Sequence, residues 1–168
     1  MSGTQLVPQK PAQAPELREL LVFELAAELY ALPLSCVREI MRLPAVTEVP
    51  RAPEAVLGLI SARGRVTTLI DLRRRLRLAE RPVGTRTRVL LVEHDDEVLG
   101  LLVDTVRQVQ RLQAQEIELA SVLGSGAPAY LLGIGRPRSA SKGVPSEGEL
   151  LLLLDLPPLL DLERGPPR

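Results

Sequence analysis

Two aspartates, Asp71 and Asp155, stand in similar surroundings, each after an apolar run and directly before a leucine. Two neighbouring carboxylates could act as general acid and general base in a hydrolysis. Each of them also precedes a short stretch of helical character, where a carboxylate caps the first backbone N–H groups. We therefore expect Asp71 and Asp155 to be helix caps at equivalent ends of two units, and not a catalytic pair.

The remaining groups that could do chemistry are isolated. His94 lies beside Asp95 and Asp96, but no second His or Cys stands at ligand spacing, which argues against a metal site. Cys36 has neither a histidine nearby nor the signature of a nucleophile, and is expected to be a small buried hydrophobe. The chain has no phosphate loop, dinucleotide fingerprint or nucleophile elbow. We expect no enzyme, no cofactor and no metal.

A run of arginines, Arg73 to Arg75 with Arg77, could form a basic patch. Because Leu72, Leu76 and Leu78 interrupt and flank it, the pattern favours the solvated face of a short helix.

Composition narrows the class of protein further. The 168 residues are 45% hydrophobic and contain one cysteine, which is enough apolar material for a core without disulfides and favours a reduced, cytoplasmic setting. The 21 basic and 21 acidic side chains cancel and only 2% of residues are aromatic, so neither charge attraction nor base stacking favours nucleic acid. The longest apolar run, 150–154, is too short to insert into a membrane.

The elements of the chain occur twice. Residues 20–44 align without gaps on residues 89–113 at an offset of 69, with eight identities in 25 pairs. A weaker match aligns 66–78 with 150–162 and keeps Asp-Leu in register. A fixed internal offset is the sequence signature of a duplicated structural unit.

Each copy is expected to hold short strands that end in a short helix. Apolar runs at 20–25 and 29–34, and again at 89–93 and 98–103, are close enough to form β-hairpins. Arg63-Gly64 supplies another tight turn, because glycine readily adopts positive φ. No stretch keeps a helical period beyond a few turns, so the sequence predicts an all-β fold of two similar small barrels packed together, with short helices.

The expected organisation is a first barrel repeat at about 16–80 and a second at about 86–162. Residues 1–15, rich in Pro, Gln and Ala, are expected to be a disordered tail. The segment 136–148 has loop composition and is expected to be mobile, and 163–168 is a C-terminal tail.

With these elements placed, residues 16–162 resemble the CheW family of chemotaxis coupling proteins. The segments that carry the resemblance are 20–40, 55–76, 97–112 and 129–135. The resemblance implies two five-stranded SH3-like barrels and a non-catalytic scaffold that couples chemoreceptors to the histidine kinase CheA. Such a protein would work in the cytoplasm, in receptor arrays at the inner face of the membrane, and other CheW-like domains are possible partners there.

The resemblance also implies two binding surfaces. A groove between the barrels would take the helical cytoplasmic tip of a chemoreceptor (a methyl-accepting chemotaxis protein), and the end of the first barrel would contact the regulatory domain of CheA. The matching receptor residues are Val37, Glu39, Gly58, Arg63, Gly64, Leu99, Gly100, Val106 and Val109, and the matching kinase residues are Val46 and Thr47.

Other interpretations stay open. Arg63 is either an interface anchor or a solvated turn residue, the three valines of the receptor set are either interface or core, and Glu39 could pair with Arg38 or Arg42. Ser61 and Thr68 replace residues common in the family, which leaves the receptor, the kinase and the output undecided, including a non-flagellar chemosensory pathway. A small nucleic-acid-binding barrel is a further alternative.

Overall fold

The computed structural model describes residues 18–137 and 148–162. Its strands are β1 (Arg18–Leu25), β2 (Glu28–Pro33), β3 (Val37–Arg42), β4 (Val56–Ala62), β5 (Arg65–Asp71), β6 (Arg88–His94), β7 (Glu97–Val103), β8 (Thr105–Leu112), β9 (Ile117–Leu119), β10 (Leu131–Gly135) and β11 (Leu151–Leu154). The helices are short: α1 (Leu72–Arg75), α2 (Leu156–Leu160) and the 3₁₀ turns η1 (Leu34–Cys36), η2 (Ala114–Glu116) and η3 (Ala120–Leu123).

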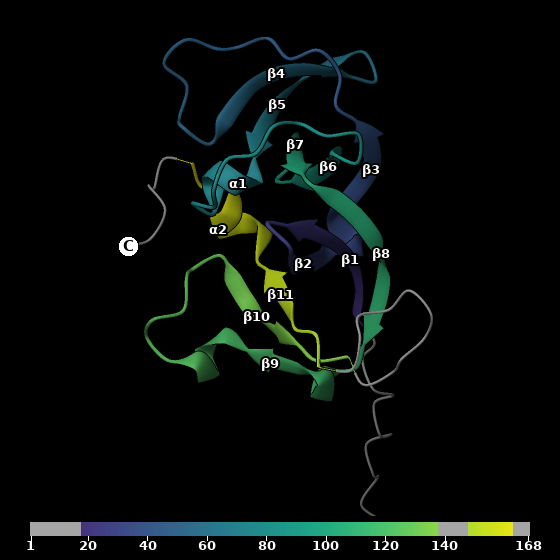
Figure 1. Cartoon of the computed structure of the whole chain (residues 1–168), viewed down its shortest axis with the longest axis vertical. Helices are drawn as coiled ribbons and strands as arrows, with labels where there is room; N and C mark the ends of the chain where they lie inside the picture. The colour runs from purple at the N-terminus through teal and green to yellow at the C-terminus, as the bar shows by residue number, and fades with distance from the viewer. Residues whose placement is uncertain (1–17, 138–147, 163–168) are drawn as a thin grey trace, which may run out of the picture.

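The strands form two sheets (Figure 1). The five-stranded sheet has the order β3-β6-β7-β5-β4, and the six-stranded sheet has the order β8-β1-β2-β11-β10-β9. Position by position the two orders match, with β3 equivalent to β8, β6 to β1, β7 to β2, β5 to β11 and β4 to β10. The sixth strand, β9, takes the place of an isolated bridge between Thr47 and Leu59 in the five-stranded sheet. The duplication read from the sequence is therefore also a duplication of structure.

Each sheet combines strands from both halves of the chain. The hairpin β1–β2 pairs with β8 and β11, and the hairpin β6–β7 pairs with β3 and β5. The expectation that 16–80 forms one barrel and 86–162 the other is corrected by this order, because the two copies have exchanged their first hairpins. The exchange joins the halves of the chain by strand pairing as well as by packing.

Three two-residue turns close the hairpins. Both turn residues have positive φ at Ala26-Ala27 (51° and 68°), Arg63-Gly64 (52° and 75°) and Asp95-Asp96 (49° and 63°). Positive φ at both positions defines the turn whose twist suits a right-handed hairpin. Gly64 and the aspartates tolerate this backbone well, whereas the alanines adopt it at a cost.

Three apolar clusters hold the sheets together. One lies within the six-stranded sheet around Leu112 and Leu153, and one within the five-stranded sheet around Leu69 and Leu91. The third and largest, here called the central cluster, gathers Phe23 with buried residues of both sheets and both α-helices. A core shared in this way makes the two sheets one packing unit.

The all-β prediction with short helices is confirmed, and one sheet has six strands instead of five because of β9. No helix within 18–137 and 148–162 is long and apolar enough to cross a membrane. The predicted tails at 1–15 and 163–168, and most of the predicted loop at 136–148, lie outside the described residues.

Candidate functional site

The predicted residues Arg63 and Glu39 form a two-point ion pair. Arg63 Nε donates to Glu39 Oε2 at 2.9 Å and Arg63 Nη2 donates to Glu39 Oε1 at 2.8 Å. The pair joins β3 to the β4–β5 turn, and thus links the two strands at opposite ends of the five-stranded order. The hydrogen bond from Arg63 lowers the pKa of the Glu39 carboxyl. The alternative in which Glu39 pairs with Arg38 or Arg42 is wrong, since its partner is Arg63.

The Arg63 side chain stays available to a partner. It is 78% exposed, against 31% for Glu39. An ion pair so open to water contributes little to folding stability. Its forked geometry nevertheless presents a preoriented guanidinium at the surface, of the kind that recognises carboxylates.

Three of the predicted apolar residues pack against the core that the two sheets share. Val37 on β3 and Leu99 on β7 come from the five-stranded sheet, and Val106 on β8 comes from the six-stranded sheet. All three are partly buried against the central cluster. Val37 and Val106 therefore belong partly to the core, and their interface role stays a prediction.

Val109 lies further along β8 and is one of the exposed large hydrophobics, at 47%. Its counterpart in the first copy is Ile40 on β3, at 42% exposed. Ile40 was not among the predicted residues, although the offset of 69 relates it to Val109. Each exposed apolar side chain lies between two exposed arginines, Arg38 and Arg42 on β3 or Arg107 and Arg111 on β8.

The predicted glycines have different positions. Gly64 lies exposed in its turn, with no atom within 4 Å of an added Cβ. Gly100 is buried and faces the five-stranded core, where a Cβ would lie 3.0 Å from Val89 Cγ1. Gly58 is buried too, and a Cβ there would lie 2.3 Å from the Thr47 carbonyl oxygen. Gly58 and Gly100 therefore act in packing inside the sheet.

The predicted kinase residues, Val46 and Thr47, lie in the segment that passes close to Gly58. Thr47 and Leu59 exchange two backbone hydrogen bonds of 2.8 Å, so the segment with Val46 and Thr47 is fixed along β4. Thr47 is exposed, whereas Val46 packs partly against the five-stranded core. The second copy repeats the arrangement at Gly133, where a Cβ would lie 2.4 Å from the Glu118 carbonyl oxygen.

Two ion pairs explain identities between the copies. Arg38 on β3 pairs with Glu93 on β6, and Arg107 on β8 pairs with Glu24 on β1. Both members of one pair match both members of the other at the offset of 69. Each pair joins strands of different copies, so identical residues support the hairpin exchange at equivalent places.

The prediction of a solvated arginine face is wrong for Arg73. Its side chain is 9% exposed and forms a forked ion pair with Asp104, which is 19% exposed. Asp104 also accepts a 3.0 Å hydrogen bond from Ala26 N in the β1–β2 turn. Burial raises the pKa of the Asp104 carboxyl, but the hydrogen bonds from Arg73 and Ala26 outweigh burial and lower it.

Arg75 is buried as well. It donates to three backbone carbonyls at the end of α2, those of Leu159 at 2.7 Å, Pro158 at 2.8 Å and Asp161 at 3.1 Å. A cation at the C-terminal end of a helix satisfies carbonyls that have no partner within the helix. Arg75 thereby ties α1 to α2, which lie next to each other (Figure 1).

The two aspartates of the catalytic interpretation stand at the starts of the two α-helices. Asp71 caps α1 by accepting from Arg73 N at 2.8 Å, as predicted. Asp155 has the equivalent position but makes no such bond, because Pro157 and Pro158 lack the N–H groups. Within the described residues no group of three His, Cys, Asp or Glu could hold a metal ion. The Cys36 thiol donates to the Pro33 carbonyl at 2.9 Å, and burial raises its pKa.

Comparison with known proteins agrees with this description. The family profile of the CheW-like domain matches residues 19–164. The chain is 31% identical to the chemotaxis protein CheW of Bacillus subtilis over 147 residues, which cover 86% of this chain and 88% of that protein. It is also 31% identical to protein FrzA of Myxococcus xanthus over 123 residues, which cover 73% of this chain and 77% of that protein.

The fold is shared with a solved member. The crystal structure of the scaffolding protein TtCheW from Thermoanaerobacter tengcongensis superposes with a TM-score of 0.75 at 27% identity, over 87% of this chain and 94% of that chain. This match confirms the predicted pair of SH3-like units. The chain therefore belongs to the CheW-like domain family, a family of non-catalytic scaffold proteins.

Proposed function

We propose that this protein binds the cytoplasmic tip of a chemoreceptor and the regulatory domain of a CheA-type histidine kinase at the same time. The observation that carries the proposal is that Val37, Leu99 and Val106, which come from both sheets, pack partly exposed against the same central cluster. The exposed Arg63–Glu39 ion pair joins β3 to the β4–β5 turn in the same five-stranded sheet. An apolar strip bordered by a preoriented charge suits one face of an amphipathic helix.

The proposed receptor surface consists of Val37, Glu39, Arg63, Gly64, Leu99, Val106 and Val109. A β-bulge between Val37 and Glu39 interrupts the alternation of side chains along β3, so that Val37 lies opposite Val92 of the central cluster and Glu39 lies opposite Leu91 of the five-stranded cluster. The two side chains therefore leave β3 on different faces. Gly58 and Gly100 support this surface from within, since an added Cβ would overlap the Thr47 carbonyl oxygen at Gly58 and crowd Val89 Cγ1 at Gly100. The proposed kinase surface is the segment of Val46 and Thr47, of which Thr47 is the exposed member.

Coupling in this proposal needs no chemistry. If the receptor and the kinase each have two conformations, a scaffold that binds one conformation of each more tightly links the two equilibria. The protein would then act in the cytoplasm within receptor arrays, where further CheW-like domains could be neighbours.

The experiment is co-sedimentation with receptor-containing membranes and a CheA-type kinase from the same cell. Arg63→Ala should weaken sedimentation with the membranes while the kinase contact remains. Arg136→Ala is the matched control, because Arg136 also forms an exposed ion pair, with Glu118 at 3.1 Å, but on the six-stranded sheet. Equal binding by both variants would remove Arg63 from the receptor surface, and absence of binding by wild type would overturn the coupling function itself.

A further inference from the structure

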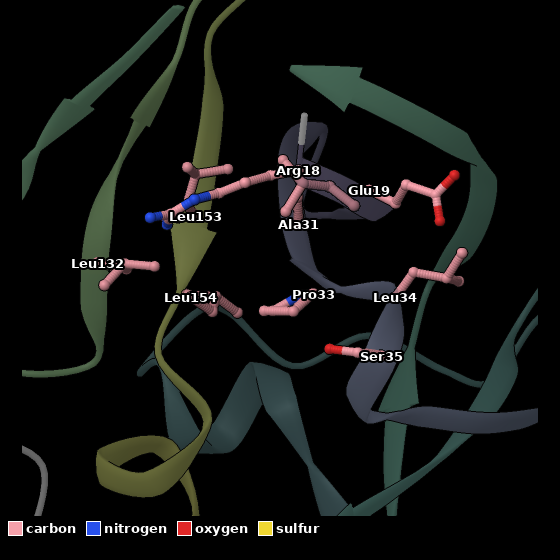
Figure 2. A pocket seen from close by; sticks show the side chains of 10 residues that line it. Arg18, Glu19, Ala31, Pro33, Leu34, Ser35, Leu132, Leu153 and Leu154 are labelled. Atoms are coloured by element: carbon pink, nitrogen blue, oxygen red, sulfur yellow. The ribbon is translucent and has the colours of Figure 1, made fainter. Parts of the chain in front are cut away.

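One position of the duplicated fold carries an ion pair in the six-stranded sheet and two cations in the five-stranded sheet. In the six-stranded sheet Glu19 on β1 lies directly opposite Arg111 on β8, and Arg111 Nε donates to Glu19 Oε1 at 2.9 Å. Figure 2 shows the Glu19 side chain extending from β1 towards β8 at the rim of an apolar pocket. At the offset of 69 the equivalent residues are Arg88 on β6 and Arg42 on β3, which also lie directly opposite each other. The five-stranded sheet thus has an arginine where the six-stranded sheet has the carboxylate.

The next arginine along each of these strands has the same pairing in both sheets. Four residues earlier, Arg38 on β3 and Arg107 on β8 each form an ion pair with a glutamate of the neighbouring strand. Opposite charges that face each other across neighbouring strands stabilise a sheet, and like charges destabilise it. Among residues 18–137 and 148–162, neither Arg42 nor Arg88 forms an ion pair. Two positive charges therefore face each other at the β3 edge of the five-stranded sheet, and no described carboxylate balances them.

The two arginines line a cavity of about 420 Å³ where β3 ends and β6 begins. Arg88 Nη1 donates to the Thr85 carbonyl at 2.9 Å and to the Thr87 carbonyl at 2.7 Å, which holds its guanidinium in place. Arg42 is exposed, so its guanidinium donors are accessible from the solvent. Guanidinium groups bind carboxylates through forked, charge-assisted hydrogen bonds. The arrangement is therefore suited to a carboxylate that approaches from outside the chain.

The exposure of the site favours a carboxylate carried by a protein over a free ion. Charges this open to water bind a small ion weakly, because salt screens them. A carboxylate on a protein adds its hydrogen bonds to other contacts, and Val83, which is 57% exposed, offers an apolar contact in the same cavity. Leu43, a further lining residue, packs against the apolar cluster of the five-stranded sheet together with Val46 of the proposed kinase surface. The chain thus leads from the arginine pair directly to the proposed kinase surface.

We propose that Arg42 and Arg88 bind an acidic side chain of the kinase regulatory domain, which supplies the carboxylate that Glu19 supplies in the six-stranded sheet. Binding of the kinase then removes the repulsion between the two arginines, and the forked hydrogen bonds fix the orientation of the kinase on the scaffold. This inference rests on the proposed function, because it extends the kinase surface from Val46 and Thr47 to the end of β3.

The test is a titration of the full-length protein and its variants with the CheA-type kinase of the same cell, without receptor. Arg42→Glu places a carboxylate opposite Arg88, as in the six-stranded sheet, and should weaken kinase binding about tenfold or more. Added salt should weaken kinase binding by wild type more steeply than binding by Arg42→Glu. The Tm of Arg42→Glu should not fall, because the change removes a repulsion. The matched control is Arg77→Glu, the same charge change at an exposed arginine outside the cavity, which should bind like wild type.

Four other results would overturn the inference. Equal kinase affinity of wild type and Arg42→Glu would remove the arginine pair from the kinase surface and leave the coupling function intact. Weaker binding of Arg42→Glu to receptor-containing membranes, with unchanged kinase binding, would assign the pair to the receptor. A clear decrease in the Tm of Arg42→Glu would contradict the repulsion between Arg42 and Arg88. Absence of kinase binding by wild type would overturn the proposed function together with this inference.

Discussion

The Arg73–Asp104 ion pair supports a prediction about stability that can be worked out from the structure. Asp104→Asn removes the charge that balances a nearly buried guanidinium, and breaking a buried pair costs about 3–5 kcal/mol. Because asparagine keeps an oxygen for Ala26 N, we expect the lower end, about 3 kcal/mol. In a chain of this size about 1 kcal/mol lowers Tm by roughly 2–4 °C, which gives a decrease of roughly 6–12 °C.

The dependence on pH gives the same prediction a second test. The pKa of Asp104 is lower in the folded protein than its unfolded value of about 3.9. Its contribution is therefore present above about pH 4 and is lost as pH falls through the folded pKa. Urea unfolding of wild type and Asp104→Asn should differ fully at neutral pH and converge in acid.

The matched control is Glu118→Gln, which breaks an exposed pair with Arg136 and should cost about 0–1 kcal/mol. If Asp104→Asn and Glu118→Gln lowered the free energy of unfolding equally, the reasoning that the buried Arg73–Asp104 pair stabilises the fold more than an exposed pair would be refuted.

Three further outcomes follow from the structure. Gly58→Ala should destabilise the protein by about 2 kcal/mol in urea unfolding, because the new Cβ would overlap the Thr47 carbonyl oxygen. The control Gly126→Ala, where an added Cβ meets open space, should change the free energy of unfolding little. Equal effects of the two changes would contradict the close approach at Gly58. Ala27→Gly should stabilise by about 0.5 kcal/mol, since alanine at a φ of 68° is strained, and a decrease would contradict the turn assignment. Arg63→Ala should leave the melting curve unchanged, and a clear loss of Tm would show that the exposed pair holds the sheet.

The repeated strands and turns could be predicted from the sequence because their signals are local. The apolar runs, the Arg63-Gly64 turn and the cap at Asp71 each depend on residues close together in the chain. The missing cap at Asp155 was also readable in principle, since Pro157 and Pro158 stand where the N–H donors would be.

The exchange of hairpins could not be predicted in the same way. An internal repeat shows which strands are equivalent but not which copy supplies the neighbour, and both pairings bury the same apolar faces. The available signal for the exchange was that Glu24 aligns with Glu93 and Arg38 aligns with Arg107. In the structure each arginine forms its ion pair with the glutamate of the other copy.

The buried arginines show a second limit. Around Leu72 and Leu76 the local pattern favours a solvated arginine face. Arg73 instead pairs with a carboxylate 31 residues away, and Arg75 with carbonyls 83 to 86 residues away. Of the candidate site, the apolar residues, Arg63 and Glu39 were proposed through the family resemblance, but the ion pair between Arg63 and Glu39 was not predicted. The inward positions of Gly58 and Gly100 required the structure.

The central claim is that one scaffold holds receptor and kinase together. The most direct measurement is the amount of CheA-type kinase that sediments with receptor-containing membranes as this protein is titrated in. The account predicts that kinase sedimentation rises with the scaffold and that scaffold, receptor and kinase appear in one complex. Kinase sedimentation that is unchanged by the scaffold, or competition between receptor and kinase for it, would contradict the account.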